Sequence, residues 1–379
     1  MHTDAEMKQQ IRILLVHLVS MGDCLFVTAL ARQIKQDYPG CHLTWAISDR
    51  CSPVILHNPY IDEIWEIFSE KMRDNFGFVW EQTKKEALAR KEKGLYDIIF
   101  FTQIIPDNLS NYDGTIRSST FRNYPNPITV PVSPIICLTE KEIENVRIFA
   151  MRYNLQEFDK VILFECSPQS KQSPVNVNFA LELSRKIVDG FEDCVILLTS
   201  NQKINTGHNR IIDASEITFR ENAELSKYCN LLIGCSSGIT WLLTSEWAKK
   251  IPTIQILNTR SLGFSFASVS YDLSYWGQST EHIIEITKSE DQYIFNCIKM
   301  TLECGVENAR NKYNQVLKPD ILSLDEIIKS LPYEEKFKNI IKILRNFYNR
   351  NKDPLMILII PYVTAKVFIG YLLNIIKKL

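Results

Sequence analysis

The fold class of this chain is set by the stretch Ile11-Arg12-Ile13-Leu14-Leu15-Val16-His17-Leu18-Val19-Ser20-Met21-Gly22-Asp23. Its apolar part, Ile11–Val16, has the length and composition of a buried strand. The strand ends before Ser20-Met21-Gly22-Asp23, and a helical pattern of apolar residues then continues from Leu25 to Ile34. A strand, a glycine turn and a helix in this order are typical of a parallel α/β sheet.

Asp23 is the acid of this turn, and two interpretations of it are open. Ligands of open α/β sheets bind at the carboxyl ends of the strands, so an acid at this position would meet a substrate. The start of a helix also favours the ionised form of a carboxylate. The alternative is that Asp23 only caps the helix, because aspartate is a favoured cap residue.

The composition is that of a globular protein with room for two domains. The chain has 379 residues, of which 45% are hydrophobic and 23% are charged. The formal net charge is −1, so no whole-molecule field indicates a nucleic-acid partner, and any basic site must be local. The first ten residues are polar and contain no apolar signal segment, which favours a cytoplasmic protein.

The ten cysteines are scattered along the chain and form no CxxC pair or metal-ligand spacing. Several lie in apolar strand-like runs, as Cys194 does in Cys194-Val195-Ile196-Leu197-Leu198. We therefore expect small buried side chains in a reducing compartment, without a disulfide framework or a metal site.

Strand-like runs alternate with helical patterns, which predicts two Rossmann-like α/β domains facing one cleft. The first domain is expected at 1–150, with the elements Ile11–Val16, Cys24–Tyr38, His42–Ile47, Ile64–Ile67, Lys71–Lys93 and Tyr96–Phe101, long loops over Ile104–Pro134 and a bridging helix Thr139–Tyr153. The second is expected at 151–290, with Val161–Phe164, Asn178–Asp189, Val195–Leu198, Ile211–Ile212, Asn222–Tyr228, Leu231–Ile233, Thr240–Ala248 and Thr253–Leu257. No GxGxxG follows the first strand, which argues against a nicotinamide dehydrogenase.

A helical extension is expected at 291–379. Within it, Ile321–Leu331 and Glu335–Tyr348 are amphipathic and rich in lysine. The apolar tail at 354–379 is interrupted by Pro361 and Lys366, so an interfacial helix at a membrane fits it better than a membrane span. The alternative is a helix that packs on the body or on a partner subunit, and association of two copies of the chain stays open.

Two further turns have the composition of anion sites. After Val161–Phe164 the chain reads Glu165-Cys166-Ser167-Pro168-Gln169-Ser170-Lys171-Gln172-Ser173-Pro174, whose hydroxyls, amides and single lysine suit a diphosphate. After Leu231–Ile233 it reads Gly234-Cys235-Ser236-Ser237-Gly238 before a helix begins. The alternatives are a polar surface loop with a solvated Lys171 and an ordinary turn between a strand and a helix.

These stretches resemble the family 9 glycosyltransferases, the lipopolysaccharide heptosyltransferases, over about residues 11–258. The resemblance is carried by the opening stretch to Asp23 and by Thr28-Ala29-Leu30, Tyr38-Pro39, Asn58-Pro59-Tyr60-Ile61-Asp62-Glu63-Ile64, Tyr96-Asp97-Ile98-Ile99, Lys171-Gln172-Ser173-Pro174, Gly234-Cys235-Ser236-Ser237-Gly238 and Pro252. It implies a GT-B fold and an inverting transfer from a nucleotide sugar without a metal or another cofactor.

The resemblance also implies roles for residues. Asp23 is then the general base, Lys171 contacts the donor diphosphate, and the other residues that face the donor are Ser167, Ser237 and Gly238. Three donor-side positions depart from the family pattern, because Ser236 stands in place of an aspartate, Trp241 in place of a histidine and Ser173 in place of a tryptophan. Ser236 and Trp241 are also expected at the donor, Trp241 either as a ring that stacks on a sugar or base or as a core residue.

The acceptor is expected to bind in the first domain. Arg117 and Arg122 lie in a loop there, and two arginines suit a phosphate or carboxylate of the acceptor, unless they are only solvated loop charges. His17 follows the first strand and either lines the site or is a histidine of the core.

The leading hypothesis is an inverting glycosyltransferase at the inner face of the cytoplasmic membrane. It would move a sugar from a nucleotide-sugar donor to a lipopolysaccharide-type or other cell-surface glycan or glycolipid acceptor. One alternative is a catalytically silent GT-B scaffold that binds a nucleotide or glycan and recruits partners. Another is a sugar-nucleotide epimerase, which is disfavoured because the turns lack a clear set of histidine and carboxylate bases.

Overall fold

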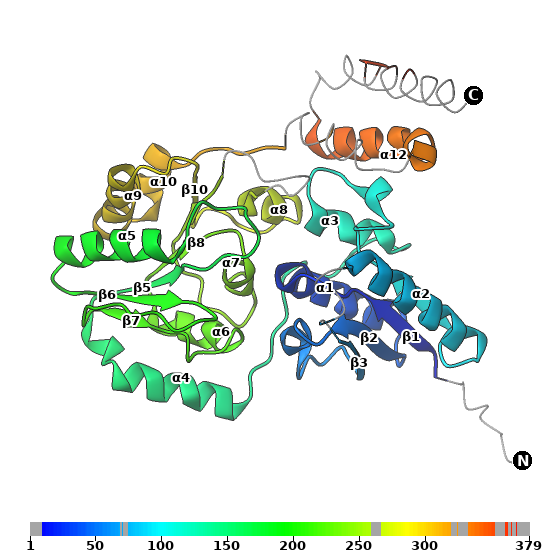
Figure 1. Ribbon diagram of the computed structural model, residues 1–379, viewed down its shortest axis with the longest axis horizontal. Helices are drawn as coiled ribbons and strands as arrows, with labels where there is room; N and C mark the ends of the chain where they lie inside the picture. The colour runs from blue at the N-terminus through cyan, green and yellow to red at the C-terminus, as the bar shows by residue number, and fades with distance from the viewer. Residues whose placement is uncertain are drawn as a thin grey trace, which may run out of the picture. The chain divides into compact units, whose positions relative to one another are not determined.

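The computed structural model describes residues 10–68, 70, 75–258, 267–319, 324, 333–352, 361, 362, 365 and 369. These residues form two compact units. The first unit contains the described residues up to Asn108 together with Thr120–Ile136, and the second contains Leu109–Ser119 and the described residues from Cys137 onward. In Figure 1 the first unit begins in blue at β1, and the second carries the green, yellow and orange elements.

The first unit is built on a four-stranded parallel sheet in the order β3-β2-β1-β4. Leu14 in the central strand pairs with Thr44 of β2 and Ile99 of β4, and the residues of Ile13–Val16 are fully buried, as expected for a parallel strand with both faces covered. The elements are β1 (Arg12–Val16), α1 (Met21–Asp37), β2 (His42–Ser48), η1 (Ser52–Ile55), β3 (Glu63–Ile67), α2 (Phe76–Glu92), β4 (Ile98–Phe101) and η4 (Phe121–Asn123).

The second unit is built on a six-stranded parallel sheet in the order β10-β9-β8-β5-β6-β7. Its strands are β5 (Lys160–Glu165), β6 (Cys194–Thr199), β7 (Ile211–Asp213), β8 (Leu231–Gly234), β9 (Thr253–Ile256) and β10 (Ile283–Ile286). Its helices are η3 (Leu109–Asn111), most of α3 (Ile116–Thr120), α4 (Glu140–Arg152), η5 (Leu155–Glu157), α5 (Val177–Gly190), α6 (Glu221–Leu225), η6 (Ser226–Tyr228), α7 (Gly238–Leu242), α8 (Val269–Tyr275), α9 (Asp291–Cys304), α10 (Val306–Tyr313) and α12 (Tyr333–Asn351).

The predicted α/β class with two parallel sheets is confirmed, but the expected boundary at residue 150 is wrong. Helix α4 belongs to the second unit, whose longer segment begins at Cys137 and not at residue 151. The reason is a buried arginine on the second unit: the Arg220 Nε donates to the Glu142 carboxylate at 2.6 Å, and the same guanidinium donates to the Cys137 carbonyl oxygen. An ion pair of this kind couples two segments that are distant in the sequence.

The expected division at residue 290 is also wrong for the residues that follow it directly. The apolar face of α9 is fully buried at Ile294, Cys297 and Ile298, in the same core as β5 and β6. Residues 291–313 are therefore part of the second unit rather than the start of a separate extension.

The loops expected over Ile104–Pro134 do not all lie at the edge of the first domain. Leu109–Ser119 belongs to the second unit. Its Thr115 and Ser118 hydroxyls donate to one carboxylate oxygen of Asp272 in α8, at 2.5 and 2.6 Å. Buried hydroxyls need partners, and here Asp272 supplies the acceptor.

Helix α7 ends at Leu242, whereas the pattern predicted a helix over Thr240–Ala248. The Thr244 hydroxyl donates to the carbonyl oxygen of Trp241 at 2.7 Å, and the Thr244 amide bonds the same oxygen. A threonine side chain that binds a nearby carbonyl competes with helix continuation.

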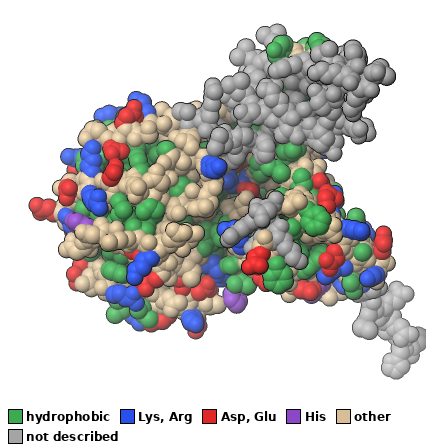
Figure 2. All heavy atoms as spheres, viewed as in Figure 1, with side chains coloured by type: hydrophobic (Ala, Val, Ile, Leu, Met, Phe, Trp, Pro, Cys, Tyr) green, Lys and Arg blue, Asp and Glu red, His purple; other side chains and the backbone are tan. Residues whose placement is uncertain are grey.

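The lysine-rich helix expected at Glu335–Tyr348 is confirmed as part of α12. The tail at 354–379 lies outside the described residues except at 361, 362, 365 and 369, and so does Ile321–Leu331 except at Leu324. Within the described part of the chain, every helix is too short or too polar to span a lipid bilayer. On the face drawn in Figure 2, basic and acidic side chains are interspersed, as a formal net charge of −1 leads one to expect.

Candidate functional site

Asp23 lies in the first turn of α1, directly after the segment that follows β1. The helix begins with the Cys24 amide donating to the Ser20 carbonyl oxygen at 2.8 Å. The Asp23 side chain is half-buried, and α1 is 17 residues long. A helix dipole favours the ionised form of a carboxylate at the amino end of a helix, and an ionised carboxylate can accept a proton.

The segment before Asp23 is held by polar side chains of the first unit. Gln103, which is buried, accepts the amides of Leu18 and Val19 at 3.0 and 3.2 Å and donates to the Val19 carbonyl oxygen at 3.0 Å. The indole of Trp45 donates to the His17 carbonyl oxygen at 2.9 Å. Residues 17–19 therefore have a defined conformation that leads into the Asp23 turn.

His17 is a core histidine in this structure. Its side chain is 1% exposed, and Nδ1 lies 3.1 Å from the Thr102 hydroxyl oxygen. Burial lowers the pKa of His17 to about 3, so the ring is neutral at physiological pH. Of the two interpretations of His17, the geometry favours the core one, because a ring that is almost completely buried offers no face to an acceptor.

Lys171 and Ser167 lie in the loop that follows β5 in the second unit. Lys171 is exposed and Ser167 is half-buried. Asn258 fixes the lysine backbone, since its side-chain amide donates to the Lys171 carbonyl oxygen at 3.0 Å and its main-chain amide donates to the Gln172 carbonyl oxygen at 2.9 Å. The loop thus presents one ammonium group to solvent on a tethered backbone.

Two buried side chains hold the turn at Cys235–Thr240. The Glu165 carboxylate accepts the amides of Cys235 and Ile239, both at 2.9 Å, and the Thr240 hydroxyl at 2.7 Å. Gln255 on β9 accepts the Ser236 amide at 2.7 Å. Burial raises the pKa of Glu165, and the hydrogen bonds from Thr240, Cys235 and Ile239 oppose that shift.

This arrangement limits which amides at the start of α7 a phosphate could reach. The Ile239 amide is taken by the Glu165 carboxylate, and α7 is only five residues long. The half-buried residues Ser237 and Gly238 remain at the tip of the turn, and the Ser237 side chain makes no capping hydrogen bond. Any ligand of this turn is therefore expected to contact its tip.

Lys171 and Ser236 share an uncommon backbone conformation. They have φ values of 56° and 50°, and they are two of the five non-glycine residues with positive φ among the described residues. The left-handed backbone conformation costs free energy for any residue that has a Cβ. Residues held in this conformation concentrate at functional sites. The Ser236 side chain is fully buried, whereas that of Lys171 is exposed.

Arg117 does not lie in the first domain as expected, and Trp241 is the core residue that one of its two interpretations allowed. Trp241 is fully buried in the second unit, and the Arg117 guanidinium carbon lies 4.0 Å from the centre of its ring. Arg117 is 8% exposed and also lies 3.6 Å from the Asp272 carboxylate. The expected place of Arg117 in the first domain is thus corrected: its guanidinium lies in the second unit and contacts Trp241 and Asp272 there. Arg122 lies in the first unit and is half-buried.

Glu165, Gln255 and Gln103 are the polar residues that the sequence reading missed. Each one interrupts or ends an apolar strand-like run: Glu165 closes Val161–Phe164, Gln255 lies inside Thr253–Leu257, and Gln103 follows Tyr96–Phe101. A polar side chain in a buried strand needs a partner, so this position is the signal that was available.

The cysteines lie mostly in the core. Eight of the ten cysteines are buried, and all ten are free thiols in this structure. Within the described ranges, no group of three or more His, Cys, Asp or Glu side chains is arranged to hold a metal ion.

Two solved structures of glycosyltransferases have a fold similar to that of this chain. A family 9 glycosyltransferase from Veillonella parvula DSM 2008 matches with a TM-score of 0.51 and 14% identity, over 84% of this chain and 97% of its own. This chain has the fold of that glycosyltransferase. The ADP-heptose lipopolysaccharide heptosyltransferase II of E. coli matches with a TM-score of 0.50 and 14% identity, over 77% of this chain and 98% of its own. No protein-family model matches the chain, and no curated protein matches it in sequence.

Proposed function

We propose that this chain is an inverting glycosyltransferase. It moves a sugar from a nucleotide-sugar donor to a hydroxyl of a lipopolysaccharide-type or other cell-surface glycan, without a metal or cofactor. The observation that carries the proposal is Asp23, a half-buried carboxylate in the first turn of a 17-residue helix that follows β1, within a fold shared with glycosyltransferases.

The proposed chemistry is a single displacement. Asp23 accepts the proton of the acceptor hydroxyl as its oxygen attacks the anomeric carbon of the donor sugar. The bond from that carbon to the diphosphate breaks, and the configuration inverts because attack and departure occur on opposite faces. Lys171 offers an ammonium charge to the departing nucleoside diphosphate, and Ser167, Ser237 and Gly238 offer hydroxyl and amide donors.

The backbone of Lys171 supports a role in binding rather than in folding. Its φ of 56° costs free energy that glycine would avoid, and its side chain is exposed. A strained lysine at a loop surface is explained if its charge is used by a ligand.

The test uses two variants and a panel of ADP-, GDP-, UDP- and CMP-linked sugars. Asp23→Asn should abolish transfer and leave donor affinity within about twofold, because the amide cannot accept the proton. Lys171→Gly should weaken nucleotide binding by about tenfold and raise the free energy of unfolding by about 1 kcal/mol. Lys141→Ala, at an exposed lysine of α4, is the control for loss of one positive charge.

Sugar transfer and calorimetric titration are both measured. Turnover retained in Asp23→Asn would contradict the base assignment. A chain that binds a donor but transfers nothing to any acceptor tested would instead be the silent GT-B scaffold.

A further inference from the structure

The two loops assigned to the donor are both connected to Glu165. Glu165 is the last residue of β5, so its backbone leads directly into the loop that carries Ser167 and Lys171. Its carboxylate binds the turn that carries Ser237 and Gly238, through the amides of Cys235 and Ile239. Glu165 therefore lies at the start of the loop that carries Lys171 and also binds the turn that carries Ser237.

We propose that Glu165 is the positioning residue of the donor site, a buried carboxylate that holds the Ser236–Gly238 turn in its ligand-binding shape. The inference rests on the proposed function for the identity of the ligand. Glu165 is 4% exposed, so it acts on the turn from beneath rather than on the ligand itself. Fixing the turn in advance lowers the entropy cost of ordering it when the donor binds.

The hydrogen bonds lie on both sides of the tip of the turn. Cys235 precedes the tip, and Ile239 and Thr240 follow it, while Ser237 and Gly238 between them are half-buried. Three donors converge on the carboxylate, which is the arrangement that a charged acceptor satisfies best. A glutamine at this position keeps the size but turns one acceptor oxygen into a donor that faces other donors.

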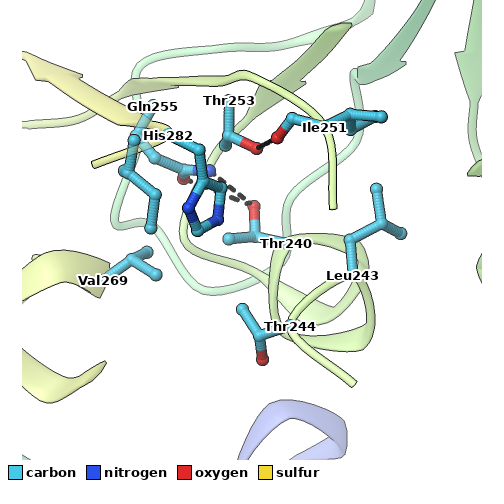
Figure 3. A pocket seen from close by; sticks show the side chains of 9 residues that line it. Thr240, Leu243, Thr244, Ile251, Thr253, Gln255, Val269 and His282 are labelled. Carbon is cyan, nitrogen blue, oxygen red and sulfur yellow. Dashed lines mark hydrogen bonds between the residues drawn. The ribbon is translucent and has the colours of Figure 1, made fainter. Parts of the chain in front are cut away.

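Gln255 also holds the turn, because its side chain accepts the Ser236 amide. Gly234 leaves room for the Gln255 side chain. Figure 3 shows the Thr240 and Gln255 side chains joined by hydrogen bonds beside a small pocket that His282 also lines. A Cβ at Gly234 would lie 2.2 Å from the Gln255 Nε2 and 2.5 Å from the Thr240 Oγ1. The network thus packs against β8 at a distance that only glycine permits.

The chain contains a matched control for Glu165. Glu285 on β10 is also a buried carboxylate with three donors: it accepts the Ser268 hydroxyl and the Val269 amide at 2.7 Å and the Ser270 amide at 3.0 Å. These donors hold the start of α8 and not the donor loops. Glu285→Gln should therefore match Glu165→Gln in its effect on stability but not in its effect on the turn.

The first measurement is binding of ADP, GDP, UDP and CDP by calorimetry to the full chain and its variants. Glu165→Gln should weaken binding of the preferred nucleotide by about tenfold, and Glu285→Gln by less than about twofold. Thr240→Val removes one donor to the carboxylate at nearly constant volume, so it should weaken binding in the same direction by a smaller factor. Equal losses in Glu165→Gln and Glu285→Gln would overturn the proposal, because general destabilisation would then explain both.

The second measurement is amide hydrogen exchange, which needs no ligand. Exchange at Cys235 and Ile239 should become faster in Glu165→Gln and in Thr240→Val, while Val269 and Ser270 stay protected. Unchanged exchange at Cys235 and Ile239 would overturn the role of Glu165. If the wild-type chain binds none of the four nucleotides, the proposed function fails, and exchange at these amides still decides whether Glu165 holds the turn.

Discussion

At the scale of single residues, His17 couples the stability of the first unit to pH. Burial lowers its pKa to about 3 in the folded chain, whereas the ordinary value is 6.5. Between these two values the unfolded chain binds a proton that the folded chain does not. The folded state therefore loses stability as the pH falls from about 6.5 toward 3, and the contribution is fully present above pH 6.5.

We predict that His17→Gln reduces this acid sensitivity. One proton taken up only by the unfolded chain costs about 2 kcal/mol between pH 7 and pH 5. Urea unfolding at the two pH values should show that loss in the wild-type chain and a clearly smaller one in His17→Gln. His57→Gln, at an exposed histidine of the same unit, is the control and should behave like the wild type. The same pH dependence in all three chains would be evidence against a neutral buried His17.

At the scale of elements, Arg350 attaches α12 to the rest of the second unit. The Arg350 guanidinium lies 2.8 Å from the Asp113 carboxylate and 3.0 Å from that of Asp272, and its side chain is 1% exposed. It also lies 4.3 Å from the ring centres of Tyr271 and Tyr275. One side chain therefore joins α12, α8 and the segment Leu109–Ser119.

We predict that Arg350→Met lowers the free energy of unfolding by about 3–5 kcal/mol, because it removes the buried cation that bridges the Asp113 and Asp272 carboxylates, even though Asp272 keeps Arg117 at 3.6 Å. Amide exchange should become faster in α12 first, where the Asn346 side chain also holds the Ser110 carbonyl oxygen at 3.2 Å. Lys342→Met changes an exposed lysine on the same helix and should cost little. A loss of less than about 1 kcal/mol in Arg350→Met would show that contacts other than Arg350 hold α12 in place.

At the scale of the whole molecule, the sequence of the tail after α12 bears on whether the chain binds a membrane surface. The sequence of 354–379 combines apolar residues with a terminal Lys377-Lys378, which is typical of a helix lying at an anionic membrane surface. This segment lies outside the described residues apart from four positions, so the hypothesis rests on the sequence.

Deletion of Asp353–Leu379 should release the chain from liposomes that contain anionic lipid. The apolar area and the lysines that bind the surface are then lost together. Flotation with anionic and with neutral liposomes measures the effect, and salt should weaken binding of the full chain only to the anionic ones. Equal flotation of the full and the shortened chain would assign the tail to packing instead.

Much of the fold follows from local patterns in the sequence. The apolar run of β1, the glycine turn and the periodic face of α1 predicted their elements to within a few residues, and β5, β6, β8 and β9 were found in the same way. The turns that contain Asp23 and Lys171 were predicted because each follows an apolar strand-like run. The boundaries at 150 and 290 were wrong because Arg220 and α9 pair with parts of the chain that no local pattern identifies.

The sequence by itself therefore determined the α/β class, the order of most strands and helices as far as β9, and the turns that carry Asp23 and Lys171. Only the tertiary structure decided that Glu165 holds the turn around Ser237, that Arg117 covers Trp241 in the second unit, and that His17 is buried. The physical reason is the range of the interactions. Hydrophobic periodicity and turn chemistry act between neighbours in the chain, whereas a buried polar group takes its partner from whichever segment the packing brings beside it.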